Sequence, residues 1–159
     1  MHIRIFLVGK VRESYIREGI SIYLRRLSVS HRINLIELPD QSKAENIPSA
    51  KDEQKRGLEA LRLMERTGPA GTLFALDAGG ELWTSEELAS HLQKLELGGA
   101  GPLAFLIGGS RGLSPSILDR ADLVLSLSPM TFPHQLVPLL LLEQIYRADC
   151  INRKIPYHK

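Results

Sequence analysis

Apolar residues in this chain gather in short runs that alternate with amphipathic stretches. Five runs have the length and the leucine, isoleucine, valine and phenylalanine content of buried strands, and they cover residues 3–8, 33–38, 72–76, 103–107 and 123–127. Polar, glycine or proline residues bound these runs, and helical patterns separate them. The alternation predicts an α/β fold in which helices sandwich a parallel-rich sheet.

Between the strand runs, apolar residues recur at helical spacing. The predicted helices cover about residues 15–27, 51–66, 84–95, 114–120 and 133–149. Thr84 and Glu87 form a capping box, and Ser114 precedes a proline suited to a first helical turn. The sequence contains no internal repeat or low-complexity linker, so we expect a single domain over residues 1–159.

Composition narrows the class of protein. A hydrophobic fraction of 43% and a charged fraction of 24% are those of a globular protein. The single cysteine, Cys150, excludes an internal disulfide and a cysteine-based metal cage, which favours the cytoplasm and no metal. No signal peptide precedes the first strand, and the apolar run 136–142 is shorter than the ~20 residues of a membrane span. We therefore expect a cytoplasmic protein that does not enter a membrane.

Charge is unevenly distributed along the chain. Residues 1–32 carry seven Lys or Arg against two Glu, residues 33–100 carry seven against twelve acidic residues, and residues 101–159 carry six against four. If the two basic ends meet in the fold, they present a positive surface to a polyanion such as RNA. Solvated helix faces without a partner are the alternative explanation.

Candidate chemistry lies after the strands, because ligands of open parallel sheets bind beyond the carboxyl ends of the strands. Three segments qualify: 76–80, 107–112 and 126–134. The Gly108-Gly109-x-x-Gly112 turn lets the backbone approach a ligand, but it matches neither the dinucleotide fingerprint nor the Walker motif, so a purely structural turn is the alternative. The semi-apolar segment 127–132 suits a flat ligand such as an adenine ring, with a buried core loop as the alternative.

The end of the chain combines an aromatic ring, an imidazole and an ammonium group in Tyr157, His158 and Lys159. This combination suits stacking on a base and contact with a phosphate in single-stranded RNA. A solvated tail is the alternative, because chain ends are usually frayed.

Four motifs together resemble one family over essentially the whole chain. They are residues 105–112 (FLIGGSRG), 127–135 (LSPMTFPHQ), 143–148 (EQIYRA) and 156–159 (PYHK). The chain resembles the RlmH-type SPOUT methyltransferases, which methylate N3 of a pseudouridine in large-subunit (23S) ribosomal RNA of the assembled ribosome.

This resemblance implies a SPOUT-type fold with a C-terminal trefoil knot, which pattern reasoning would not propose because knots are nearly absent from proteins. It also implies a homodimer, large-subunit ribosomal RNA as partner and S-adenosylmethionine held in the knot. The implied cofactor contacts are Leu76, Gly108, Leu127, Ser128, Pro129, Met130, Thr131 and Phe132.

The same resemblance suggests catalytic roles near the end of the chain. Methyl transfer from a sulfonium needs alignment and a nucleophilic form of the base, not a metal. Arg147 is the candidate for stabilising the pseudouridine anion or gripping the RNA, His158 for accepting the N3 proton, and Tyr157 for orienting the base. We expect His134 to cap the last helix or to lie at the dimer contact, and Glu143 to be a buried interface carboxylate.

Two positions depart from the family pattern. Pro138 stands where an arginine is usual and is expected to kink the last helix, and Asp149 stands where an aromatic residue is common. Two other functions remain open: a SPOUT enzyme for another RNA position, such as one in transfer RNA, and a non-catalytic RNA-binding or ribosome-associated module.

Overall fold

A parallel sheet of five strands forms the centre of the molecule. The computed structural model describes residues 1–40, 50–68, 71–99 and 101–158, so Lys159 lies outside the described residues. The strands are β1 (His2–Val8), β2 (Arg32–Leu38), β3 (Thr72–Leu82), β4 (Leu103–Ile107) and β5 (Leu123–Ser126), in the order β2-β1-β4-β3-β5 with every pairing parallel. The predicted parallel sheet is confirmed.

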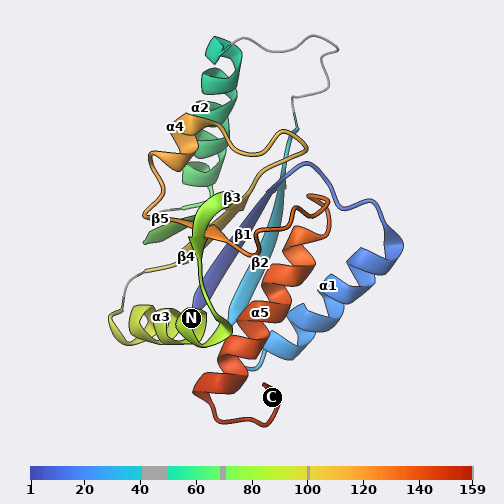
Figure 1. Ribbon diagram of the computed structural model, residues 1–159, viewed down its shortest axis with the longest axis vertical. Helices are drawn as coiled ribbons and strands as arrows, with labels where there is room; N and C mark the ends of the chain where they lie inside the picture. The colour runs from blue at the N-terminus through green and yellow to red at the C-terminus, as the bar shows by residue number, and fades with distance from the viewer. Residues whose placement is uncertain (41–49, 69–70, 100, 159) are drawn as a thin grey trace.

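Helices cover both faces of this sheet (Figure 1). One face carries α1 (Ser14–Leu27), α3 (Ser85–Leu97) and α5 (Val137–Asn152), and the other carries α2 (Ala50–Arg66) and α4 (Pro115–Leu118). Alternation along β1 divides its side chains between the two cores, since Ile5 packs in the α5 core and Phe6 in the α2 core. The predicted α/β sandwich is confirmed.

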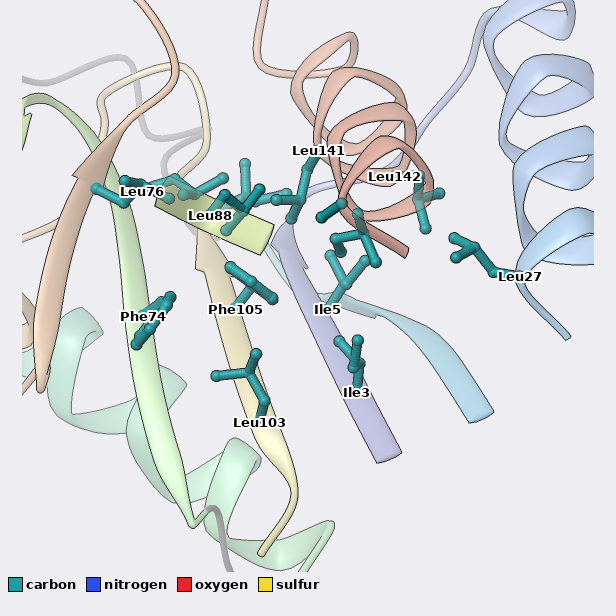
Figure 2. Packing of buried hydrophobic residues seen from close by; sticks show 14 of the residues in the cluster. Ile3, Ile5, Leu27, Phe74, Leu76, Leu88, Leu103, Phe105, Leu141 and Leu142 are labelled. Carbon is teal, nitrogen blue, oxygen red and sulfur yellow. The ribbon is translucent and has the colours of Figure 1, made fainter. Parts of the chain in front are cut away.

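Helix α5 packs on the middle of the sheet, between α1 and α3 (Figure 1). Leu141, Leu142 and Ile145 are completely buried, and Figure 2 shows Leu141 on the side of α5 nearer the strands and Leu142 on the side toward Leu27. Burial of each such side chain contributes roughly 1.5–3 kcal/mol. The helix is therefore a core element, which agrees with its apolar sequence. Whether it threads a knot stays a prediction.

The start of α5 differs from the sequence-based prediction. The helix begins at Val137 and not at Pro133, and residues 133–136 form a turn closed by the Leu136 N–H and the Pro133 carbonyl at 2.8 Å. Pro138 then lies in the first turn, where a backbone N–H has no helical acceptor, so the predicted kink is wrong. The capping role of His134 is also wrong, because Leu136 occupies the N-cap position.

Strand β3 is longer than predicted. It continues through Leu82, and its pairing with β5 shifts between Leu76 and Glu81, so residues 77–80 belong to the strand and not to a loop. A Cβ atom on Gly80 would lie 2.6 Å from the Val124 carbonyl oxygen, which explains the glycine at this close approach. Strand β5 ends at Ser126, one residue earlier than predicted.

Helix starts with clear signals were predicted correctly. The Glu87 N–H donates to Thr84 Oγ1 at 3.1 Å, and the Thr84 N–H donates to Glu87 Oε2 at 2.7 Å. This reciprocal capping box fixes the start of α3. Ser114 is the N-cap residue of α4, which is shorter than expected. None of the helices in the described ranges is long and apolar enough to cross a membrane.

Asp149 fastens the end of α5 to the turn between α1 and β2. Its carboxylate accepts a hydrogen bond from Ser30 Oγ at 2.9 Å and lies 3.4 Å from His31 Nε2 and 3.3 Å from Arg153 Nη1. Because it is 8% exposed, these partners are what make its burial tolerable. Burial also lowers the pKa of His31, against the opposing effect of Asp149. An acidic residue at this position is thus accommodated by the neighbouring turn.

We expect His31 to make the protein less stable in mild acid. A lowered histidine pKa in the folded state means that the unfolded chain binds more protons, so stability falls as the pH drops through about 6.5. Urea unfolding between pH 7.5 and 5 should show a shallower loss of unfolding free energy in His31→Gln than in the wild type. Equal slopes for the two proteins would contradict this prediction.

Candidate functional site

The sheet register brings three of the predicted cofactor segments together. Leu76 of β3 is the register partner of Ile107 of β4 and of Leu125 of β5. The segments that begin at Gly108 and Leu127 therefore leave the sheet on either side of Leu76, at the carboxyl edge. Residues from three separate parts of the sequence thus meet at one place.

Gly108 begins a very tight turn. The Gly112 N–H donates to the Gly109 carbonyl at 3.0 Å, and Gly112 has a φ of 73°, in the region that favours glycine. A Cβ atom on Gly108 would lie 2.5 Å from the Gly112 carbonyl carbon, so any side chain would force the turn open. Gly108 and Gly112 thus have a structural reason to be glycines, because the turn closes on its own backbone.

The segment 127–132 is a partly exposed loop that two serine side chains hold with hydrogen bonds. Ser126 Oγ donates to the Ser128 carbonyl at 3.0 Å, and Ser128 Oγ accepts the Met130 N–H at 2.9 Å. Met130 is 74% exposed and Phe132 is 38% exposed, so the buried-loop alternative is wrong for these two residues. Their apolar surface is available to a ligand. Leu76, in contrast, is buried and lies between its register partners Ile107 and Leu125.

A cavity of about 120 Å³ adjoins the glycine turn on the side of α2 and α4. The ends of β1 and β2, helix α2 and residues 109–114 line it, while residues 127–132 do not. Residues 109–114 of the turn thus line this cavity, while Gly108, at the start of the turn, lies beside Leu76.

A second group of candidates gathers around Glu143 of α5. Glu143 Oε1 accepts hydrogen bonds from Arg147 Nε at 3.1 Å and Nη2 at 2.5 Å, and from the Tyr157 hydroxyl at 3.1 Å. We call Tyr23, Glu86, Glu143, Arg147, Tyr157 and His158 the tail cluster. At its centre, the Glu143 carboxylate binds Arg147 and Tyr157 of its own chain. Arg147 is therefore already paired with a negative charge.

Tyr157 packs at the middle of the tail cluster. The Arg147 guanidinium carbon lies 4.9 Å from the centre of its ring, and the ring meets that of Tyr146 edge to face at 4.9 Å. The Tyr157 hydroxyl is also 3.4 Å from that of Tyr23. The hydrogen bond with Tyr23 and burial raise the pKa of Tyr157, so it is a neutral phenol, and Glu143 raises the pKa of Arg147. The solvated-tail alternative is wrong for Tyr157.

His158 bridges two helices. Its Nε2 atom is 2.8 Å from Glu86 Oε1 of α3, and its Nδ1 atom is 3.4 Å from Arg147 Nη1 of α5. The three predicted catalytic residues, Arg147, Tyr157 and His158, are therefore brought together.

The tail cluster and the carboxyl-edge loops are far apart in one chain. Arg147 lies about ten residues into α5, which corresponds to ~15 Å along the helix axis. In Figure 1, α5 starts near the carboxyl edge of the sheet and its other end, with the C-terminus, lies toward the amino-terminal edge. The structure does not bring the predicted catalytic residues to the predicted cofactor residues within one chain.

The sequence did not predict three residues that lie around the C-terminal tail. Tyr23 and Arg26 come from α1, and the Arg26 guanidinium carbon lies 5.3 Å from the Tyr23 ring centre and 5.5 Å from that of Tyr146. The basic, aromatic sequence of α1 was a signal for these two residues. Glu86 carried no signal, because one glutamate in a first helical turn is common. In the described part of the chain, no group of three His, Cys, Asp or Glu residues is placed to hold a metal ion.

Comparisons with known proteins agree on one family. A family model described as "Predicted SPOUT methyltransferase" matches residues 1–158. The chain is 48% identical over 157 residues to "Ribosomal RNA large subunit methyltransferase H" of Desulforamulus reducens, covering 99% of this chain and 98% of the relative. It is 45% identical over 159 residues to the protein of the same name from Alkaliphilus oremlandii, with complete coverage of both.

Solved structures resemble the chain in fold. A methylase family protein from Haemophilus influenzae matches with a TM-score of 0.57 and 14% identity, over 99% of this chain and 70% of that chain. A methyltransferase structure from Bordetella pertussis matches with a TM-score of 0.54 and 17% identity, over 92% of this chain and 94% of that chain. At such identities the likeness shows the fold alone.

Glu143 should hold the tail onto α5. In Glu143→Ala, the Tyr157 hydroxyl and Arg147 both lose their acceptor, so we expect trypsin to cut after Arg153 or Lys154 several-fold faster than in the wild type. Mass spectrometry of timed digests measures this rate. Glu65→Ala, at an exposed position of α2, is the matched control. Equal cleavage rates in the wild type and Glu143→Ala would refute the role.

Proposed function

Because the chain belongs to the SPOUT methyltransferase family, we propose that it uses S-adenosylmethionine to methylate N3 of a pseudouridine in 23S ribosomal RNA. We propose the assembled ribosome in the cytoplasm as its substrate and a single domain over residues 1–159. The observation that carries the proposal is the meeting of Leu76, Gly108 and the loop after β5 at the carboxyl edge of the sheet.

The residues at this edge fit the cofactor. The turn at Gly108 closes without side-chain bulk beside Leu76, and Met130 and Phe132 present exposed apolar surface suited to an adenine ring. When bound, S-adenosylmethionine would supply an electrophilic methyl group: N3 would bond to the methyl carbon as the carbon–sulfur bond breaks, and the sulfur of the departing S-adenosylhomocysteine would keep that electron pair. The proposed contacts are Leu76, Gly108, Leu127, Ser128, Pro129, Met130, Thr131 and Phe132.

The tail cluster supplies groups suited to the target base. Arg147 is a permanent cation that favours the N3 anion, although it must share or leave its pairing with Glu143 to do so. Tyr157 is a neutral phenol that can stack on the base or donate a hydrogen bond to it. His158 is the proposed acceptor of the N3 proton.

The distance between the two groups of residues supports a homodimer. Along α5, the tail cluster lies ~15 Å from the loop that precedes the helix, so one chain does not place its own proton acceptor beside its own cofactor loop. In a two-fold dimer, the tail of one subunit can meet the cofactor loop of the other. We further propose that the C-terminal helix forms the trefoil knot of the family.

Ribosomal RNA is the proposed partner for two reasons. The relatives at 48% and 45% identity are named as ribosomal RNA large subunit methyltransferases and match the chain over almost their whole length. In addition, Arg17, Arg25 and Arg26 are exposed on α1, and Arg26 adjoins Tyr23 of the tail cluster. A basic surface beside the proposed catalytic residues suits the phosphate backbone of RNA.

Methylation of ribosomes tests the proposed function directly. Ribosomes from a strain that lacks the homologous gene are incubated with the protein and cofactor labelled in the methyl group. Mass mapping should then find one labelled N3-methylpseudouridine in 23S RNA. Label in transfer RNA alone would favour another SPOUT specificity. Absence of both label and cofactor-binding heat in calorimetry would favour a non-catalytic module.

A mixed dimer tests the shared site. Gly108→Ala should raise the Kd for S-adenosylmethionine by about tenfold or more, because the added carbon meets the Gly112 backbone. His158→Ala should bind the cofactor normally but methylate poorly. At a cofactor concentration well below the Kd of Gly108→Ala, each variant alone should be nearly inactive, and co-refolding the two in equal amounts should give about a quarter of wild-type activity, since half of the dimers then hold one intact site. No recovery, with heterodimers verified by native mass spectrometry, would refute sharing between subunits.

A further inference from the structure

The two ring nitrogens of His158 have chemically different partners. An arginine side chain can only donate hydrogen bonds, so Nδ1, at 3.4 Å from Arg147 Nη1, faces a donor. A carboxylate without a proton can only accept, so Nε2, at 2.8 Å from Glu86 Oε1, faces an acceptor. For a neutral imidazole, this pair of contacts favours the tautomer that carries its proton on Nε2.

Glu86 is well suited to stay ionised and so to accept the hydrogen bond from His158 Nε2. Its own backbone N–H and His158 donate hydrogen bonds to the carboxylate, which lowers the pKa of Glu86 below its usual range. Glu86 also lies in the first turn of α3, where the helix dipole favours a negative charge. The neighbouring capping box, made by Thr84 and Glu87, holds this turn in place. The carboxylate therefore comes from a fixed element and not from the tail itself.

We propose that Glu86 is a positioning residue that orients His158 with Nδ1 as the proton-accepting atom. This inference rests on the proposed function, because it specifies how His158 would accept the proton of pseudouridine. A carboxylate that fixes the tautomer and orientation of a catalytic imidazole is an arrangement that several enzyme classes use. In this chain, the carboxylate and the imidazole come from helix α3 and from the last residues of the described chain.

The proton step follows from this orientation. Arg147 first moves from Nδ1 toward the target base, where it favours negative charge on the ring. The N3–H bond of pseudouridine then breaks, its electron pair stays on N3, and the proton bonds to Nδ1. His158 becomes an imidazolium whose Nε2–H remains bonded to the Glu86 carboxylate. The positive charge of the His158 imidazolium thus forms beside the negative charge of Glu86. The electron pair on N3 becomes the nucleophile.

The tautomer can be tested without any activity measurement. Nitrogen-15 NMR of protein labelled in histidine should show that His158, assigned with a His158→Asn variant, carries its proton on Nε2 and has a bare Nδ1. In Glu86→Ala the same signals should shift toward a mixture of the two tautomers. A wild-type signal with the proton on Nδ1, or signals that are the same in Glu86→Ala, would overturn the proposal.

Kinetics then test whether the orientation matters for the reaction. At saturating cofactor, Glu86→Ala should lower kcat for ribosome methylation about tenfold and leave KM for ribosomes and the Kd for the cofactor within about twofold. Glu86→Gln should lose less, because its amide oxygen still accepts the Nε2 proton. Glu65→Gln, an exposed glutamate of α2 far from the tail cluster, is the matched control.

The outcomes separate this inference from the proposed function. A change in KM alone, or a kcat equal to that of the wild type, would overturn the role of Glu86 while the wild type still methylates ribosomes. If the wild type methylates no RNA, the proposed function fails, and the role of Nδ1 as acceptor fails with it. If, in that case, the NMR signals of His158 still change in Glu86→Ala, the contact between Glu86 and His158 has a structural role only.

Discussion

The burial of α5 on the sheet is the interaction on which the rest of the structure depends. Leu141, Leu142 and Ile145 are completely buried between the sheet and the neighbouring helices (Figure 2). Because the loop after β5 leads into one end of this helix and the tail leaves from the other, the packing of α5 fixes where both candidate groups lie. Asp149 adds a polar anchor at the far end through Ser30 and His31.

The separation of the two groups follows from that packing. A straight helix of this length holds its ends apart, so a cofactor bound at the carboxyl edge and an imidazole in the tail are kept from one another within a chain. The two proposed groups also differ in chemistry. The group proposed to hold the cofactor has small and mostly apolar residues, and the group proposed to act on the base is a network of charged and aromatic side chains centred on Glu143.

Much of the fold could be predicted from the sequence, because it follows from periodicity and local signals. The strand runs are mostly apolar, and those of β1 and β4 are almost completely buried, as in sheets covered on both faces. The Thr84–Glu87 capping box marks its helix start within a residue. The wrong predictions have two sources, a tertiary contact for β3 and a local turn for α5. The extension of β3 past Leu76 depends on its approach to β5 at Gly80, and the late start of α5 depends on the turn at Pro133.

The candidate site was predicted unevenly for a similar reason. The post-strand rule and the motifs together selected Gly108 and the loop 127–132, which the register brings beside Leu76. The partners of the tail were not predictable, because contacts such as Glu86 with His158 join residues far apart in sequence. Only the folded chain shows that Arg147 is already paired with Glu143.

Pro138 has a consequence for the unfolded chain as well as for the helix. Its ring fixes φ near the helical value before folding begins, so the chain has fewer conformations to lose when α5 forms. Replacements of this kind at compatible positions typically contribute about 0.4–1 kcal/mol through the entropy of the unfolded state. Pro138, which was expected to kink the helix, therefore favours the conformation of its first turn, next to the loop proposed to hold the cofactor.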